Sequence, residues 1–520
     1  MGGQVRSGRR EGELEHPEQQ RRRGAQRHHA TAPHAHLPIA TNRTGSMSGV
    51  PHHLSRWIGL AGSVLLAVAA FLGGALPHGD LRPTPVSIWQ GPHGPLIIAT
   101  WLVGTALLAW AWWSLRDQVP DTRWVLVTIA LWLLPMLVTP PLGSRDAYAY
   151  ACQGASYAGG INPYEQGVSA LPCPWLDTIS YIWRDTPAPY GPLFVVLSGA
   201  VVTAAGSLAG SVALFRLLAV AGVALTAWTL PVLARRCGVP PQRALWLALA
   251  CPLVPVHLIS GAHNDAMMVG LLVAGLAVVA SRPGRPLPLL AGGLLLGLAG
   301  AIKVTALVVL PFAALAAIVG PYRIRTLLRD GGWVVGAAVA TVVGVTLAAG
   351  LDFGFISGLE QGGLVVAWTS PPTAVGQTVG YLAAIFGAHV DALPVTRAIG
   401  MVVLLALLVW LWFRAFRRRD PFWHAGLALA ATVALSPLFH PWYWTWPLVV
   451  LAATARRTGW FSLVALVSSF LVLADGTGLP RWTKMPGAPL MTLLVIVVTV
   501  RLVRSARAAR RPVPADRGAD

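Results

Sequence analysis

The chain has 520 residues, of which 55% are hydrophobic and only 11% are charged. Soluble domains carry about a quarter charged residues, so too few remain here to cover a water-exposed surface. This excludes a soluble enzyme, a disordered scaffold and a secreted disulfide module, and predicts an all-α polytopic integral membrane protein. The net charge of +19 is compatible with nucleic-acid binding, but membrane proteins also gather Lys and Arg on their cytoplasmic side.

Residues 1–55 form a polar tail that holds half of the 14 His residues and eight Arg against four Glu. No signal-peptide core or small-residue cleavage site follows the basic residues. We therefore expect a disordered, basic cytoplasmic tail, or a true start at Met47. A metal-binding His tract and a contact with anionic lipid are the alternatives.

Fourteen apolar runs follow the tail, and we expect about 14 transmembrane helices within a membrane domain at 56–503. The runs lie near 57–76, 95–114, 124–140, 211–234, 244–259, 266–281, 287–302, 304–319, 332–350, 398–414, 421–438, 442–455, 460–474 and 489–503. Residues 192–208 are also apolar, but a span there would place Arg235 and Arg236 outside. This segment and residues 375–388 are therefore expected to be juxtamembrane helices on the outer face.

The distribution of charge supports a cytoplasmic N-terminus. If the spans alternate from the inside, 23 basic and 6 acidic residues beyond the tail lie inside, and 8 basic and 10 acidic residues lie outside. The inner set includes a basic C-terminal tail at 504–520. These basic residues on the cytoplasmic side account for most of the net charge. We therefore expect a multi-pass plasma-membrane protein that binds the lipid bilayer and no nucleic acid.

The longest polar stretch outside the tail begins at 141, and we expect an extracytoplasmic catalytic loop with its juxtamembrane helix at 141–210. Its polar part, 141–191, contains six of the nine Tyr residues. Rings beside carboxylates suit a sugar, because the ring stacks on the C–H face while the carboxylate accepts hydroxyl protons. An aromatic belt at the membrane surface explains the rings equally well. Cys152 and Cys173 both lie outside, so a disulfide between them is allowed.

Asp146 lies at the exit of the third expected span, where an unpaired charge is costly. A carboxylate at this depth is placed to act as general base on an acceptor hydroxyl. A salt bridge to Arg145, or a capping role for the next helix, is the plainer interpretation.

Four blocks of sequence carry a resemblance to a known family. The first is Asp146 followed by YAYACQG, then GGINPY and DTPAPYGPLF, and the others are GAHNDAMMVGLLVAGL (261–276), AIKVTALVVLPF (301–312) and LSPLFHPWYWTWPL (435–448). In this order they resemble the actinobacterial polyprenol-phosphomannose-dependent α-(1→6)-mannosyltransferases, which have the GT-C fold.

The resemblance implies a chemistry. The donor would be polyprenol-phosphate-mannose, and the acceptor an α-mannoside of a lipomannan-type cell-envelope glycan. Transfer would invert the anomeric centre, with Asp146 as general base on the extracytoplasmic side. His263 and Asp265 are spaced as two ligands of a metal, but no further ligand cluster accompanies them, and we expect none to be needed.

Candidate substrate-binding residues lie in the same blocks. Cations at the outer face would neutralise the leaving phosphate, above all Lys303, which lies between apolar helices without a local counterion. The alternative for Lys303 is snorkelling to the outer headgroups. The candidates are Arg145, Tyr148, Tyr164, Arg184, Tyr190, His263, Asn264, Asp265, Lys303, His440, Trp442 and Tyr443.

Two other functions compete with this interpretation. A GT-C enzyme for another lipid-linked sugar, such as an arabinosyl or glucosyl donor, would share the fold, the loop and the base. A transporter or flippase of lipid-linked sugars would instead show inverted repeats and broken helices with midplane charges. No convincing repeat is visible, and the acids gather in the outer loops, which favours an enzyme.

Overall fold

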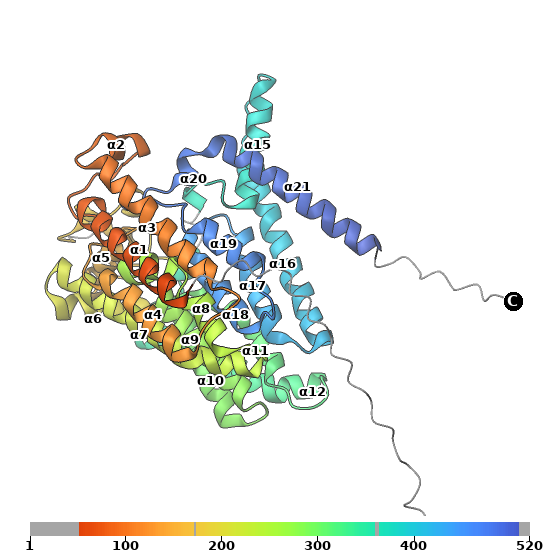
Figure 1. Ribbon diagram of the computed structural model, residues 1–520. Helices are drawn as coiled ribbons and strands as arrows, with labels where there is room; N and C mark the ends of the chain where they lie inside the picture. The colour runs from red at the N-terminus through yellow and green to blue at the C-terminus, as the bar shows by residue number, and fades with distance from the viewer. Residues whose placement is uncertain (1–50, 171–172, 359–362, 509–520) are drawn as a thin grey trace, which may run out of the picture. The chain divides into compact units, whose positions relative to one another are not determined.

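The computed structural model describes residues 51–170, 173–358 and 363–508 (Figure 1). These residues are helical throughout, with only one isolated β-bridge, between Val472 and Gly478, and no strand within the described part. The expected class, an all-α polytopic protein, is thereby confirmed. Most of the N-terminal tail and the end of the C-terminal tail lie outside the described residues.

Every apolar run of the sequence lies on a helix. The helices are α1 (His52–Gly73), α2 (Pro85–Gln90), α3 (Gly94–Ser114), α4 (Thr122–Leu133), α5 (Asp146–Ala158), α6 (Pro192–Ala205), α7 (Leu208–Arg236), α8 (Pro241–Leu249), α9 (Asp265–Ser281), α10 (Pro286–Ile302), α11 (Leu310–Ala316), α12 (Ile324–Thr326), α13 (Gly332–Ala348), α14 (Phe355–Gly358), α15 (Pro371–Ile385), α16 (Leu393–Arg418), α17 (Pro421–Leu435), α18 (Thr445–Thr454), α19 (Trp460–Ser468), α20 (Leu479–Trp482) and α21 (Lys484–Ala508).

Six of the described helical segments are long and apolar enough to cross a membrane, and a seventh results if one bent pair is counted as a span. The bent pair is α8 and the π-helical turn η5 (Val254–Ser260), which meet at 68° across a break that contains Pro252. Further apolar helices, such as α9 and α10, have 10–17 residues, which is shorter than a full span of about 20. The structure therefore establishes a multi-pass protein with six or seven candidate spans.

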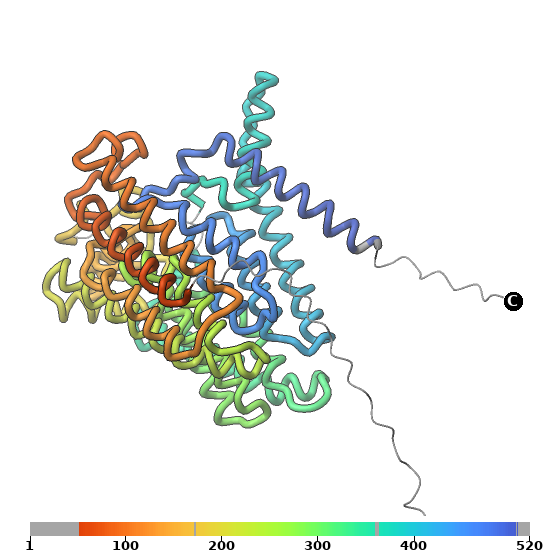
Figure 2. The backbone as a smooth tube through the Cα atoms, viewed as in Figure 1, coloured from red at the N-terminus to blue at the C-terminus, as the bar shows by residue number. Residues whose placement is uncertain are grey.

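The two segments expected beside the membrane are both helical. Residues 192–208 contain α6, which packs against α5, and residues 375–388 contain most of α15, which packs against α16 and α21. Figure 2 shows α21 as a long rod that runs beside α15 and then leaves the other helices. The loop around α5 is closed by a disulfide between Cys152 and Cys173, which the sequence allowed but did not establish.

Helices in the first half of the chain pack closely where glycines face one another. A Cβ atom at Gly62 of α1 would collide with the backbone of Gly104 in α3, and one at Gly270 of α9 would collide with Gly222 in α7. Small residues allow such close approach of the backbones of membrane helices. In lipid, van der Waals packing rather than the hydrophobic effect drives helices to associate. These contacts make α1–α3 and α7–α9 rigid supports for the loops at their ends.

Helices α9, α10 and α17 each run between an arginine-rich end of the described bundle and the end that carries the polar loops. Arg282 and Arg285 lie between the end of α9 and the start of α10, whereas Asp265 begins α9 and Lys303 follows α10. Helix α17 likewise leads away from arginines 417–419 towards His440. A 15-residue helix is about 22 Å long, so the two sets of residues lie roughly one helix apart.

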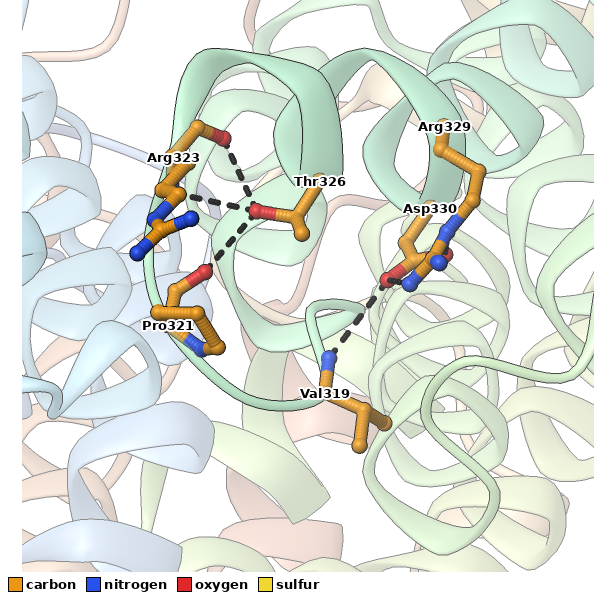
Figure 3. Close-up of polar contacts among 6 residues, drawn as sticks. All are labelled: Val319, Pro321, Arg323, Thr326, Arg329 and Asp330. Atoms are coloured by element: carbon orange, nitrogen blue, oxygen red, sulfur yellow. Dashed lines mark hydrogen bonds and ion pairs between the residues drawn. The ribbon is translucent and has the colours of Figure 1, made fainter.

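The corner between α11 and α13 belongs to the arginine-rich end (Figure 3). Arg329 binds Asp330 with two hydrogen bonds of 2.7 and 2.8 Å, and Thr326 Oγ1 accepts a bond from the backbone N–H of Arg323 and donates one to the carbonyl of Pro321. Asp330 is buried, so the arginine neutralises a carboxylate that would otherwise be costly. These contacts fix the turn that reverses the chain.

Arg216 is a buried cation in the middle of the bundle, 6% exposed. From α7 its guanidinium donates 2.8–3.1 Å hydrogen bonds to the carbonyls of Leu137, Thr139, Ile259 and Ser260. These two segments directly precede the loops of Asp146 and His263. Arg216 therefore holds both loops against one helix.

Replacing Arg216 by Met should destabilise the protein by about 3 kcal/mol or more, because several buried carbonyls lose a charged donor. Thermal unfolding in nanodiscs measures the effect. Arg236→Met is the matched control, since Arg236 is exposed and contacts only the carbonyl of Ser281. Equal unfolding temperatures for the two variants would contradict the role of Arg216.

Candidate active site

A cavity of about 840 Å³ opens among the polar loops. Its wall includes the segment between α1 and α2, the start of α5, residues 179–190, and the segments that follow α17 and α19. The chemically distinctive lining residues are Arg82, Arg145, Asp146, Gln153, Tyr181, Trp183, Tyr190, Lys303, His440, Trp442, Tyr443, Trp446, Asp475, Arg481 and Trp482. The cavity is thus rich in rings and in charges of both signs.

Asp146 is the first residue of α5, and its side chain is 23% exposed to the cavity. One carboxylate oxygen lies 3.5 Å from Nε2 of His263. Burial alone would raise the pKa of Asp146, but the His263 side chain, together with Ser144 and His440, lowers it to about 2. Asp146 is therefore an ionised acceptor at neutral pH, and Arg145 does not pair with it: the Arg145 guanidinium donates to the carbonyls of Thr178 and Asp80.

His263 is held rigidly behind Asp146. It is fully buried, its ring lies 4.4 Å from that of Trp442, and its Nδ1 is 2.6 Å from the carbonyl of His257. A carbonyl only accepts hydrogen bonds, so Nδ1 carries a proton and Nε2 faces the carboxylate. Ala262 before it has a φ of 51°, which non-glycine residues rarely adopt. The backbone is thus bent at some cost to direct this imidazole at Asp146.

Lys303 occupies a separate, buried corner of the cavity. Its ammonium lies 2.9 Å from Asp265 Oδ1 and 4.5 and 5.0 Å from the ring centres of Tyr443 and Trp446. The indole of Trp446 donates a 2.6 Å hydrogen bond to the same Asp265 oxygen. Lys303 has no counterion close to it in the sequence, as noted above. The structure provides a distant one across the bundle, because Asp265 is 38 residues away along the chain.

Several aromatic rings also line the inner wall. The imidazole of His440 stacks on Trp442 at 4.3 Å with an interplanar angle of 8°, and burial lowers the pKa of His440 to about 4. His440 is therefore neutral at pH 7 and offers one donor and one acceptor. Tyr190 lies edge-on to Tyr150 at 5.1 Å and faces the Lys303 ammonium at 6.0 Å.

The structure brings seven of the thirteen predicted site residues into the cavity wall: Arg145, Asp146, Tyr190, Lys303, His440, Trp442 and Tyr443. A second group, His263, Asn264 and Asp265, lies directly behind this wall and supports it through Asp146 and Lys303.

The remaining three predicted residues do not line the cavity. The Tyr148 hydroxyl donates to the carbonyl of Ala75, and the Tyr164 hydroxyl donates to that of Tyr190. Arg184 forms a 3.6 Å ion pair with Asp177 on the loop surface. In this structure these three side chains hold the loop together.

Among the charged and amide side chains of the cavity wall, four were not singled out from the sequence: Arg82, Gln153, Asp475 and Arg481. Three of them are charged residues in loops that the sequence predicts to lie outside. Because few charged residues are expected there, each of the three could have been picked out from the sequence.

Fold and cavity together define a multi-pass membrane protein with a carboxylate, an imidazole and a buried ammonium around one polar cavity. Protein-family models described as "Alpha-(1->6)-mannopyranosyltransferase, N-terminal domain" and "MptB C-terminal domain" match residues 56–319 and 372–501. The chain belongs to this mannosyltransferase family and is a glycosyltransferase. This decides for an enzyme over the transporter alternative.

Curated relatives are similar over most of their length. An alpha-(1->6)-mannopyranosyltransferase of Mycobacterium tuberculosis is 32% identical over 80% of this chain and 81% of its own. Alpha-(1->6)-mannopyranosyltransferase A of the same organism is 31% identical over 86% and 92%, and the B enzyme of Corynebacterium glutamicum is 30% identical over 82% and 78%. No solved structure matches the chain.

Proposed function

We propose that the protein transfers mannose from polyprenol-phosphate-mannose to an α-mannoside acceptor, with inversion, and so forms α-(1→6) linkages of lipomannan-type cell-envelope glycans. Family membership supports mannose as the transferred sugar and α-(1→6) as the linkage. The observation that carries the mechanism is the ionised Asp146 in the cavity wall, backed by His263 and facing the same cavity as the Lys303 ammonium.

The transfer is a single displacement. The oxygen of the acceptor's 6-hydroxyl bonds to the anomeric carbon of the donor. Asp146 accepts the proton of this hydroxyl as the new bond forms. The bond from that carbon to the phosphate oxygen breaks, and its electron pair leaves with polyprenyl phosphate. Lys303 offsets the negative charge that develops on this phosphate. No covalent intermediate forms, so one carboxylate suffices.

We further propose a GT-C architecture of about 14 spans at 56–503, with the short apolar helices crossing the membrane as pairs or tilted segments. The cavity would face the extracytoplasmic side, since the arginine-rich helix ends lie at the opposite end of the bundle. A lipid-linked donor is then reached from the outer leaflet. A cysteine placed at Ser180, in the cavity wall, should react with an impermeant thiol reagent in intact cells, and protection from it would overturn this orientation.

The activity is tested with purified protein in nanodiscs, supplied with polyprenyl phosphates that carry mannose, glucose or arabinose and with a short α-mannoside. We expect consumption of the mannosyl donor and a product cleaved by an α-(1→6)-specific mannosidase. Turnover of the glucosyl or arabinosyl donor alone would favour the alternative GT-C activity. No turnover of any polyprenyl phosphate sugar would overturn the proposal.

A further inference from the structure

A second cavity, of about 430 Å³, lies at the arginine-rich end of the bundle. One wall is the turn 283–286 between α9 and α10. The other wall belongs to the corner between α11 and α13, where the lining residues are Val319, Arg329, Asp330 and Trp333. Figure 3 shows the first three of these side chains. We call this cavity the corner pocket, and it shares no lining residue with the cavity of the candidate active site.

The turn between α9 and α10 is fixed by its own sequence. Pro283 and Pro286 flank it and restrict the backbone on both sides. Gly284 lies between them with a φ of 73° and donates a 2.9 Å backbone hydrogen bond to the carbonyl of Ala317. A Cβ atom at Gly284 would also collide with the side chain of Val319, which together with the positive φ favours glycine. This wall of the corner pocket is therefore rigid.

The corner pocket carries an uncompensated positive charge. On one wall, Arg329 and the buried Asp330 neutralise each other through two hydrogen bonds of 2.7 and 2.8 Å. These bonds use two of the five N–H groups of the guanidinium, and the others remain for a further acceptor. On the other wall, Arg285 is exposed, and no carboxylate oxygen lies within 4.0 Å of it among the described residues. Two arginines and one aspartate thus leave a net charge of +1, which suits a singly charged anion.

Exposed apolar side chains adjoin these charges. Leu287 follows the turn, Leu328 precedes Arg329, and the indole of Trp333 forms part of the pocket wall. Helix α13 begins at this corner, is part of a candidate membrane span and packs against α10. Tryptophan is enriched where membrane helices reach the headgroup region. The corner pocket therefore offers surface both to a charged head and to apolar chains.

We propose that the corner pocket binds the phosphodiester headgroup of one anionic phospholipid, whose acyl chains lie against the exposed apolar side chains of α10 and α13. The two guanidiniums present planar donors that match phosphate oxygens. Basic pockets between membrane helices hold anionic headgroups in this way. In the proposed orientation the lipid belongs to the cytoplasmic leaflet, and the inference does not depend on which sugar the enzyme transfers.

The bound lipid has a structural consequence for the candidate active site. It joins the turn after α9 to the corner before α13, and so holds α9 and α10 in place at their arginine-rich ends. The opposite ends of these two helices carry Asp265 and Lys303, which form the buried ion pair. A lipid in the corner pocket therefore stabilises the pair of helices on which that ion pair depends.

The test uses the full chain in phosphatidylcholine nanodiscs that contain a small fraction of a photoactivatable lipid, either phosphatidylglycerol or phosphatidylcholine. Phosphatidylglycerol should label peptides that contain residues 283–286 and 319–333 about 5- to 30-fold more than phosphatidylcholine does, because each nearby arginine favours an anionic lipid by about fivefold. Arg285→Gln should lower this ratio about fivefold. The matched control is Arg418→Gln, an exposed arginine at the same end of the bundle but outside the pocket, and it should keep the wild-type ratio.

Three labelling results would overturn the proposal. The first is equal labelling of the pocket by both lipids. The second is an equal loss in Arg285→Gln and Arg418→Gln, which would assign the effect to the general surface potential of this end. The third is loss of the phosphatidylglycerol labelling when inorganic phosphate is added, which would make the ligand a soluble anion instead of a lipid.

Thermal unfolding gives an independent measurement. The wild type should unfold at a higher temperature in nanodiscs that contain phosphatidylglycerol than in pure phosphatidylcholine, since a ligand that binds the folded state stabilises it. Arg285→Gln should lose this difference, whereas in pure phosphatidylcholine it should unfold like the wild type because its side chain is exposed. Arg418→Gln should keep the difference. Equal wild-type unfolding temperatures in the two bilayers would contradict a lipid held by the corner pocket.

Discussion

Asp146→Asn is expected to lower the turnover of mannosyl transfer by about 10²- to 10⁴-fold, the usual contribution of a general base. Asparagine has nearly the same size and keeps the Ser144 contact to the backbone at this position, which measures 3.0 Å. It cannot take the proton from the acceptor hydroxyl. The KM for donor and acceptor should therefore change much less than kcat, as measured with purified variants in nanodiscs.

Asp177→Asn is the matched control for this variant. Asp177 belongs to the same loop region, 141–191, but its side chain is 99% exposed and contacts only Arg184. It should turn over like the wild type. If Asp146→Asn also kept more than a tenth of wild-type turnover, the base would have to be another group.

The pH dependence follows from the same contacts. The folded-state pKa of Asp146, about 2, lies below the ordinary value of 3.8, so its contribution to stability is present above about pH 4 and is lost as the pH falls towards 2. Between pH 5 and 8 the carboxylate stays ionised. An acid limb of activity in that range would therefore report a different group.

The positions of the helices were predictable because hydropathy is local. Most apolar runs, and also the apolar segments of α6 and α15, became helices within a few residues of their expected bounds, although runs 244–259, 304–319 and 442–455 are each divided between two helical segments and run 460–474 is helical only to Ser468. The break between α8 and η5 was not predicted, because run 244–259 is apolar on both sides of Pro252 and hydropathy does not register a bend. The bend leads into the turn that carries His263, whose imidazole lies beside Asp146.

The site was only partly predictable for a different reason. Asp146 could be singled out by its depth and its neighbours, but its contact with His263, and that of Lys303 with Asp265, join helices distant in the chain. No local pattern encodes those pairs. Tyr148, Tyr164 and Tyr190 are alike in sequence, and only helix phase and loop path decide that Tyr190 alone lines the cavity.

The second large effect concerns Lys303. Lys303→Met should lower turnover by at least about 10²-fold, because the developing phosphate charge loses a buried cation in a site of low dielectric. The same change leaves the fully buried Asp265 without its ammonium, which costs about 3–5 kcal/mol of stability. A loss of activity in this variant alone would thus mix two causes.

The double variant Lys303→Met/Asp265→Asn separates them, because it removes both charges and keeps an acceptor for the Trp446 indole. It should regain most of the wild-type unfolding temperature and still turn over at least about 10²-fold more slowly. Lys303→Arg keeps the charge and should retain measurable transfer. The contrary result is a double variant that unfolds like the wild type and transfers mannose at the wild-type rate. It would show that Lys303 only neutralises Asp265. The leaving phosphate would then need another cation of the same cavity, such as Arg145.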